Sequence, residues 1–427
     1  MASTTTATTA TTSTPSTMLL SPQQPPRDLS HLRALVPVAT HRDASGQAHT
    51  YLNASFQPPM NLIVRSAIQS FLDEATFSPH PKPTWQSRAE DLRALLATYL
   101  HAPSASTIAL TRDTTEGLNL IQRSLALQPG DNVLILDSEH PNQACGWLAL
   151  RDTIPGLEIR QIPTAGTAHE FHATAATFEP FVDARTRAVG LSSCMFHSGQ
   201  RNDVAGIAAA FRPRGIHVLA DLTQEVGFGR VDVQELGVSA AAFGLHKGLG
   251  CPTGLGALYV DHAVLGELKG TPPIVGAGAV ANLKADLTVS AEEGLVYHGS
   301  ARRFEHLNVS LVAVHAARAA VRFLLYDVGV GALEAHLRAL GRRLREGAAR
   351  LGVPVVGEVE EEKRAPQATV LALRDERWME LLERERIRVS AYRLGIRVSV
   401  GFYNNEADID RLLEVLEKGK EAGIPFC

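Results

Sequence analysis

Between residues 107 and 259 the sequence alternates short runs of β-branched and apolar residues with longer amphipathic segments. The short runs are typical of buried strands, and the amphipathic segments are typical of helices that cover a sheet. Strands that alternate with helices usually pair in parallel, so the pattern predicts a mostly parallel sheet with helices on both faces. The expected strands are residues 107–112, 131–137, 187–194, 216–221, 240–245 and 256–260.

A second pattern begins near residue 300, where long helical stretches lead into a few strands and a final amphipathic helix. This order predicts a smaller α+β domain. Its expected helices are residues 308–325, 332–352 and 405–420, and its expected strands are residues 353–359, 368–374 and 387–400. The expected division of the chain is a disordered tail at 1–26, a segment at 27–57 that packs with the small domain, a large domain at 58–300 and a small domain at 301–427.

Composition and charge exclude several kinds of partner. A formal net charge of -4 gives no sign of the basic stripe that nucleic-acid binding requires. No apolar run approaches the roughly 18–20 residues that cross a bilayer. Residues 1–26 also lack the charged and apolar regions of a signal or transit peptide. We therefore expect a cytoplasmic protein that binds a small molecule, with no nucleic acid and no membrane as partner.

The cysteines give no sign of a metal site or a disulfide framework. Cys145, Cys194, Cys251 and Cys427 are widely spaced, and no two of them form a CxxC pair. Zinc sites and disulfide-rich domains place cysteines at short, recurring spacings. We therefore expect reduced cysteines and no metal.

Polar residues follow the first two expected strands, and open parallel sheets bind their ligands at such strand ends. Thr114 and Thr115 begin a helix whose first amide groups can bind an anion. An ordinary helix cap has the same kind of sequence. His140 follows the next strand, where a lone histidine is more often structural than catalytic.

Two charged residues follow later strands. Asp221 ends a buried strand, where a carboxylate loses hydration unless a cation pairs with it, although a helix cap is an alternative role. Lys247 lies between an apolar run and a glycine-rich loop, so we expect its pKa to fall and its nucleophilic neutral form to become accessible. An anion site, a flat ring, a carboxylate and a desolvated amine together match one cofactor, pyridoxal 5'-phosphate.

Six motifs stand in a fixed order along the chain: TRDTTEGLNL, ILDSEHPNQACGW, VLADLTQEVG, AAFGLHKGLGCPTGLGALYV, ARRFEHLNVS and IRVSVGFYNNEADID. In order and spacing they resemble the class V aminotransferase group of fold type I pyridoxal-phosphate enzymes. That group includes isopenicillin N epimerase-like proteins, cysteine desulfurases and selenocysteine lyases. The resemblance covers about residues 51–415. It implies a large domain with a mostly parallel seven-stranded sheet, a smaller α+β domain, and a homodimer with active sites at its interface.

The resemblance assigns roles to four residues at the cofactor ring. It implies that Lys247 holds the cofactor covalently, that Asp221 pairs with the pyridinium nitrogen, and that His140 stacks on the ring. It also implies that Gln224 forms a hydrogen bond with the phenolic oxygen of the cofactor.

The phosphate contacts that the resemblance implies are less complete. Thr114 and Thr115 would hold the phosphate, with help from His246. Family members usually carry a phosphate-binding serine at the position of Gly244. In many relatives a threonine near the position of Asn308 reaches the phosphate of the neighbouring subunit. We therefore expect the contacts to the cofactor's phosphate in this chain to differ from those in its relatives.

Substrate contacts follow from the same resemblance. Arg397 would bind the substrate carboxylate through a bidentate pair of hydrogen bonds, although a surface ion pair is its ordinary alternative role. Asn53 and Phe56 resemble the family's N-terminal substrate-loop motif, so Phe56 would line the pocket or act as an apolar anchor. Phe196 stands where relatives commonly have an asparagine near the phenolic oxygen.

A missing cysteine bears on the reaction. Cysteine desulfurases place a mobile cysteine ahead of the carboxylate-binding arginine, but residues 386–397 contain none, and Cys427 is a poor replacement. The chain is therefore expected to act at the α-carbon of an amino acid or an amino-acid conjugate, as an aminotransferase-like or epimerase-like enzyme. The resemblance places it nearest the epimerase-like branch, which includes enzymes of specialised metabolism.

The sequence leaves two alternative functions open and disfavours a third. The first is a lyase that works by β- or γ-elimination or decarboxylation, and the second is a non-catalytic binding protein with the same fold. A nicotinamide-dependent dehydrogenase is disfavoured because GLGCPTGLG lacks the spacing of a dinucleotide-binding loop.

Overall fold

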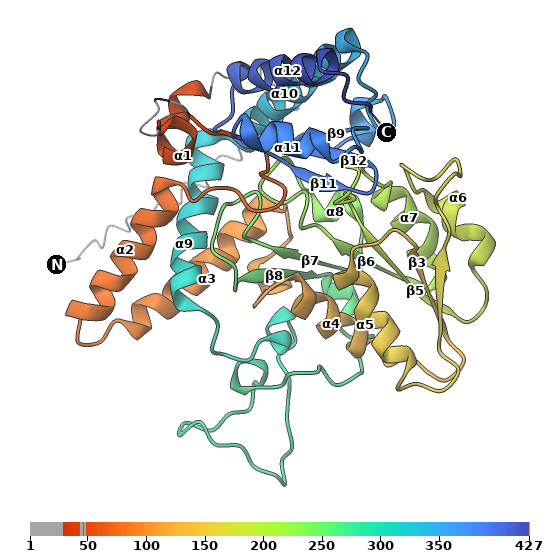
Figure 1. Ribbon diagram of the computed structural model, residues 1–427. Coiled ribbons are helices and arrows are strands. Elements are labelled where there is room, and N and C mark those ends of the chain that lie inside the picture. Colours follow the sequence, from red (N-terminus) through yellow and green to blue (C-terminus); the bar gives the residue numbers. More distant parts are fainter. Residues whose placement is uncertain (1–28, 43–45, 47, 427) are drawn as a thin grey trace, which may run out of the picture.

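A seven-stranded sheet forms the centre of the larger part of the molecule (Figure 1). The computed structural model describes residues 29–42, 46 and 48–426, so the expected tail at 1–26 and Cys427 lie outside the described residues. The strand order is β2-β8-β7-β6-β5-β3-β4, and every neighbouring pair is parallel except those of β8, which runs antiparallel to β2 and β7. The prediction of a mostly parallel seven-stranded sheet is therefore confirmed.

Six of the seven strands fall where the sequence predicts them, and one was not predicted. The strands are β2 (Ile108–Thr111), β3 (Asn132–Leu136), β4 (Glu158–Ile162), β5 (Thr186–Ser192), β6 (His217–Asp221), β7 (Ala240–Gly244) and β8 (Gly256–Val260). The unexpected strand is β4, which lies at the edge of the sheet and is exposed or half-buried over most of its length. An edge strand needs no continuous apolar run, so EIRQI gave no signal of a buried strand.

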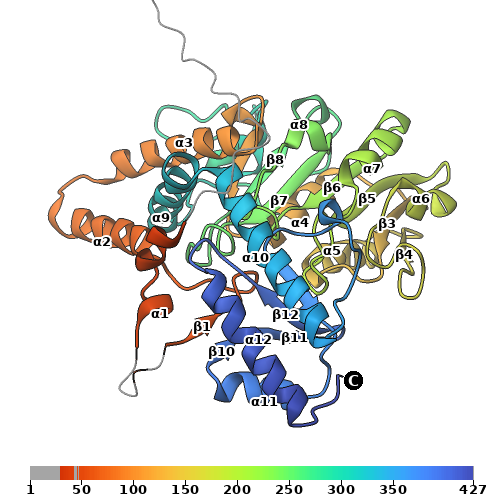
Figure 2. The same cartoon turned by 90° about the horizontal axis from the view of Figure 1, so that it is seen from above.

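Helices bury both faces of the sheet (Figures 1 and 2). Successive side chains of a strand point to opposite faces, so Val133 and Ile135 join one apolar cluster while Leu134 and Leu136 join the other. Helices α4 (Thr114–Ser124) and α5 (Pro141–Arg151) cover the first cluster. Helices α3 (Lys82–Tyr99), α7 (Val204–Phe211) and α9 (Leu311–Arg322) cover the second.

The remaining helices complete the two domains. They are α1 (Pro37–Thr40), α2 (Leu62–Phe77), α6 (Ala175–Phe178), α8 (Val233–Leu236), α10 (Val330–Leu351), α11 (Arg377–Arg384) and α12 (Glu406–Glu421). In the part of the chain that the structure describes, none has the length and hydropathy that a bilayer span requires.

The C-terminal part contains two small sheets. An antiparallel sheet has the order β11-β12-β9, and a two-stranded parallel sheet joins β1 to β10. These strands are β1 (Thr50–Tyr51), β9 (Ala368–Leu371), β10 (Ile387–Arg388), β11 (Ser390–Tyr392) and β12 (Gly395–Ser399). The N-terminal segment also forms an ion pair between Arg33 and Asp408 on α12. The exact domain boundaries stay a prediction.

The expected strand at residues 353–359 is wrong. In this segment Val355 forms an isolated bridge with Leu371, and no regular strand is present. Pro354 has no amide hydrogen to donate to a ladder, and Gly357 has a φ of 92°, which is incompatible with extended backbone. The β-branched composition of the segment therefore did not produce a strand.

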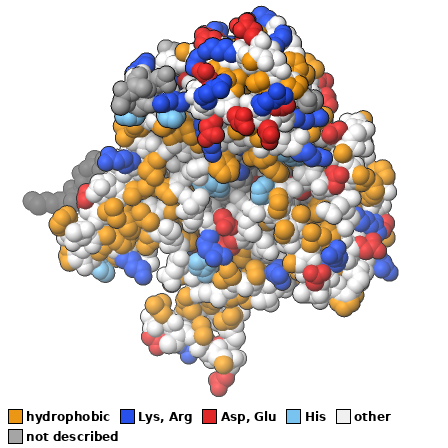
Figure 3. All heavy atoms as spheres, viewed as in Figure 1, with side chains coloured by type: hydrophobic (Ala, Val, Ile, Leu, Met, Phe, Trp, Pro, Cys, Tyr) orange, Lys and Arg blue, Asp and Glu red, His pale blue; other side chains and the backbone are white. Residues whose placement is uncertain are grey.

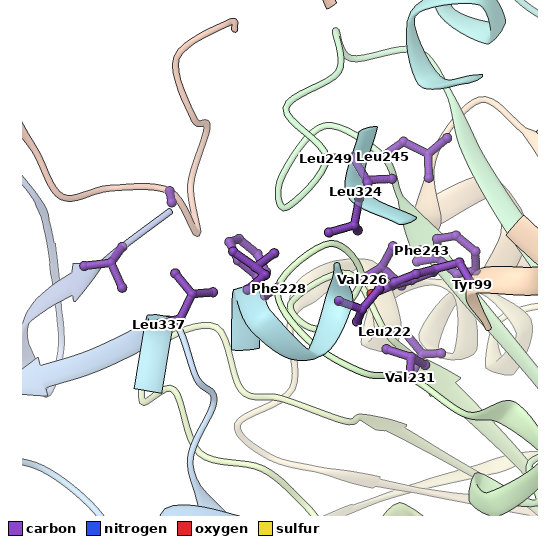
Figure 4. Close-up of a cluster of buried hydrophobic side chains, with 14 of the residues drawn as sticks. Tyr99, Leu222, Val226, Phe228, Val231, Phe243, Leu245, Leu249, Leu324 and Leu337 are labelled. Atoms are coloured by element: carbon purple, nitrogen blue, oxygen red, sulfur yellow. The ribbon is translucent and has the colours of Figure 1, made fainter. Parts of the chain in front are cut away.

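A tight contact between two loops fixes the backbone next to Lys247. A Cβ atom on Gly248 would lie 2.3 Å from the carbonyl oxygen of Val226 and 2.5 Å from the carbonyl carbon of Gly227. Real Cβ atoms do not approach so closely, so only glycine fits at this position. Figure 4 shows the apolar cluster beside this contact, in which Val226 and Leu249 pack among residues of several elements. The loop that carries Lys247 is thus held by packing as well as by its flanking strands.

Candidate active site

A cavity of about 480 Å³ lies at the carboxyl ends of β5, β6 and β7. Asp221 ends β6, Lys247 follows β7, and His140 caps the start of α5. The small domain contributes Tyr392 from β11 and Arg397 from β12. Side chains that are far apart in the sequence therefore meet at one site between the two domains.

Most of the predicted site residues meet in this cavity. Those that line it are Phe56, Thr114, His140, Asp221, Gln224, His246, Lys247 and Arg397. Three others do not line it. Asn53 accepts a hydrogen bond at Oδ1 from Ser390, Asn308 is exposed elsewhere, and Thr115 is the second residue of α4. The roles that the resemblance gave to these three stay predictions.

Among the described residues that line the cavity, Lys247 is the only lysine, and its amine has lost much of its hydration. The pKa of Lys247 is lowered to about 8, chiefly by burial; the Asp221 carboxylate opposes this shift, and the Arg397 guanidinium adds to it. A lysine in water titrates near 10.4, so this amine is neutral in a much larger fraction of molecules near neutral pH. A neutral amine is the nucleophilic form.

Asp221 and Gln224 are oriented by hydrogen bonds to the main chain. The Oδ1 atom of Asp221 accepts a hydrogen bond of 2.8 Å from the amide of Thr223. Gln224 donates from Nε2 to the carbonyl of Ser55 at 3.2 Å. Both side chains are buried at the cavity wall, so they are held before any ligand enters.

His140 presents a neutral ring. Its Nδ1 accepts a hydrogen bond of 3.1 Å from the amide of Asn142, and this acceptor cannot carry a proton. Burial lowers the pKa of His140 and the Lys247 ammonium adds to this effect, although Asp221 opposes it. The ring meets Phe196 edge-on with 4.9 Å between centroids, which fixes its orientation.

Arg397 has unused donors. Its guanidinium lies 4.7 Å from the centroid of Tyr392, and Nη1 donates to the carbonyl of Phe196. Within the described residues, the buried Nε and Nη2 atoms have no hydrogen-bond partner. Buried donors without partners cost free energy, which a bound carboxylate would recover.

Several cavity residues were not predicted. Thr223 lies between Asp221 and Gln224, so the spacing of those two already placed it in the same loop. Tyr392 could not be placed without the β11–β12 pairing. Cys194 also lines the cavity, and burial raises its pKa to about 12, so its thiol is protonated and poorly nucleophilic.

These groups fit pyridoxal phosphate. A desolvated amine, an oriented carboxylate and a neutral flat ring lie around one cavity, and the N-terminus of α4 supplies amide groups for an anion. Arg397 offers its unpartnered donors to a substrate carboxylate.

Comparisons with known proteins agree with this geometry. The family model described as Aminotransferase class-V matches residues 77–412. An uncharacterized aminotransferase of Schizosaccharomyces pombe is 50% identical over 377 residues, which cover 88% of this chain and 93% of the yeast protein. A cysteine desulfurase of Dickeya dadantii is 32% identical over 317 residues, 72% of this chain and 73% of that protein. The structure of an apo cysteine desulfurase from Thermococcus onnurineus superposes with a TM-score of 0.78 at 20% identity, covering 92% and 98% of the two chains.

The lowered pKa of Lys247 predicts how cofactor binding depends on pH. Only the neutral amine attacks the cofactor's aldehyde, so the rate at which apo-protein binds pyridoxal phosphate should rise with pH and level off above about 8. Stopped-flow absorbance between pH 6 and 10 measures this midpoint. Because Asp221 raises the pKa and Arg397 lowers it, Asp221→Asn should move the midpoint down and Arg397→Gln should move it up. A midpoint above 10, or shifts of the same sign in both variants, would contradict the assignment.

Proposed function

Because this chain belongs to the class-V aminotransferase family and is a pyridoxal-phosphate-dependent enzyme, we propose that it acts at the α-carbon of an amino acid or an amino-acid conjugate, by aminotransfer or epimerisation. The observation that carries the proposal is the placement of Lys247, Asp221 and Arg397 around one cavity. The amine and the carboxylate suit the cofactor, and the free donors of Arg397 suit the carboxylate of an amino acid.

Asp221, His140 and Lys247 would each have a separate role at the cofactor. The bound cofactor supplies an electron-withdrawing ring that weakens the bonds at the α-carbon of an attached amino acid. Asp221 would keep the pyridinium nitrogen protonated, and His140 would hold the ring plane. Lys247, with a pKa near 8, is suited to take a proton from the α-carbon and to return one there.

Arg397 would orient the substrate. Its guanidinium is buried, stacked on Tyr392 and bonded to the carbonyl of Phe196, so its remaining donors point from a fixed position. A carboxylate bound there in bidentate fashion is fixed in both distance and direction. The α-carbon of the same substrate is then held at a defined place relative to Lys247.

Cleavage of a bond further along the substrate, as in a lyase, is the second candidate. The identity with a cysteine desulfurase favours it. Transfer of sulfur to a protein thiol is disfavoured, because the turn between Tyr392 and Gly395 carries no cysteine and the cavity thiol of Cys194 is protonated.

Incubation with a panel of amino acids in deuterated water separates these reactions. We expect α-deuterium exchange together with a keto acid or the opposite enantiomer. Ammonia or sulfide in place of these products would favour the lyase.

Arg397→Ala should raise KM roughly 10- to 100-fold through the loss of hydrogen bonds to a charged group, with the cofactor's visible absorbance unchanged. The matched control is Arg393→Ala, an exposed arginine in the same hairpin. Loss of cofactor in the Arg397 variant, or an equal effect of the control, would overturn the role.

We also propose that two copies of this chain form a dimer. Exposed apolar side chains gather on helix α2 and on the segment that projects from the body of the molecule at residues 270–300, and Figure 3 shows hydrophobic surface in both regions. They include Leu62, Leu72 and Phe77 on α2 and Leu287, Val289, Leu295 and Val296 on the projecting segment. Extended apolar surfaces of this kind mark protein interfaces.

Sedimentation equilibrium tests the dimer. The expected mass is about twice the 45.9 kDa of one chain, and Phe77→Glu should shift the protein toward the monomer because it places a charge in the buried interface. Val359→Glu is the matched control, since Val359 is 86% exposed and Phe77 is 82% exposed. A wild-type mass of one chain at micromolar concentration would refute the dimer.

A further inference from the structure

Two buried threonine hydroxyls meet at one end of the cavity. Thr114 is the first residue of α4, and Thr223 follows Asp221 at the end of β6. Their Oγ1 atoms are 2.7 Å apart, and both residues line the cavity. Thr114 is 4% exposed and Thr223 is 6% exposed, so the pair faces the cavity and has little contact with bulk solvent.

The pair lies beside the one position on β7 that has no side chain. A Cβ atom on Gly244 would lie 2.7 Å from Nδ1 of His246 and 3.3 Å from Oγ1 of Thr114. The amide of Gly244 also donates to Oγ1 of Thr223 at 3.4 Å. The His246 imidazole therefore occupies the space that a side chain at residue 244 would need, and the Thr114 hydroxyl lies at the edge of that space.

Hydrogen-bond counting leaves one hydroxyl proton of the pair unused. A hydroxyl has one donor and two acceptor positions. If Thr114 donates to Thr223, then Oγ1 of Thr223 accepts from both Thr114 and the Gly244 amide, and its own proton remains for a ligand. If the direction is reversed, the proton of Thr114 remains. In both cases the pair offers an O–H donor beside the N-terminus of the eleven-residue helix α4, where amide groups favour an anion.

We propose that Thr223, acting with Thr114, is a binding residue for the cofactor's phosphate and supplies the hydroxyl contact that Gly244 cannot make. The proposal rests on the cofactor assignment above and concerns a residue to which neither the motifs nor the comparisons give a role. It also makes Thr223 a link between the two ends of the cofactor site, because its amide holds the carboxylate of Asp221.

This geometry allows a clean test, because the bond to Asp221 comes from the main chain and survives a change of side chain. Thr223→Val keeps the shape of the residue and removes only the hydroxyl. The probes are pyridoxal phosphate and pyridoxal, which has the same aldehyde and ring but no phosphate. Absorbance titration of the apo-protein gives the dissociation constant for each.

We expect Thr223→Val to weaken pyridoxal phosphate binding roughly tenfold or more, as the loss of a hydrogen bond to a charged group predicts, and to leave pyridoxal binding unchanged. Thr223→Ser retains the hydroxyl and should bind both probes like the wild type. Equal weakening for both probes, or no weakening for pyridoxal phosphate, would overturn the proposal. Failure of the wild-type protein to bind pyridoxal phosphate at all would instead refute the cofactor assignment.

A second measurement covers the case in which Thr223→Val folds poorly or pyridoxal binds too weakly to titrate. Inorganic phosphate should raise the unfolding temperature of wild-type apo-protein and of Thr223→Ser, and should raise it less in Thr223→Ala. The matched control is Thr164→Val, which removes a buried threonine hydroxyl bonded to Asp137 outside the cavity and should leave the phosphate effect intact. Equal stabilisation of Thr223→Ala and Thr223→Ser by phosphate would contradict the role.

Discussion

The burial of the Lys247 amine at the end of β7 is the constraint on which the rest of the site depends. An ammonium group taken out of water is unstable unless charges or hydrogen bonds replace its hydration. Burial therefore increases the fraction of molecules in which the amine is neutral. The Asp221 carboxylate opposes this shift and the Arg397 guanidinium adds to it. As a result, the Lys247 amine populates both its neutral and its protonated state near neutral pH. This suits a residue that forms a covalent bond and moves protons.

That balance requires a rigid support. The loop after Lys247 packs backbone to backbone on the loop at Gly227, and apolar residues of the core pack beside it (Figure 4). Main-chain hydrogen bonds fix the carboxylate of Asp221 and the ring of His140. The small domain contributes Arg397, which is held by an aromatic ring and a carbonyl. The cavity is thus largely preorganised, and Arg397 brings to its wall two buried donors that have no hydrogen-bond partner among the described residues.

Much of this could be predicted from the sequence, since buried parallel strands are apolar runs and the residues after them are brought together by topology. The amine, the carboxylate and the histidine were found in that way, and the resemblance added Arg397. The edge strand β4 was missed because three of its five residues are polar and only Ile162 is buried, and the strand expected at 353–359 was wrong because Pro354 and Gly357 interrupt it. Contacts between distant segments gave no local signal. The hydroxyl pair of Thr114 and Thr223 joins residues 109 positions apart and is visible only in the fold.

Chemical capture of the cofactor tests most directly the claim that Lys247 holds it. Borohydride reduction of the loaded enzyme fixes the cofactor to the amine that carries it, and peptide mass mapping then locates the added mass. The account predicts a single modified peptide that contains Lys247, and no stable modification in the Lys247→Ala variant. Modification of a different lysine in the wild-type protein, or of none, would contradict it.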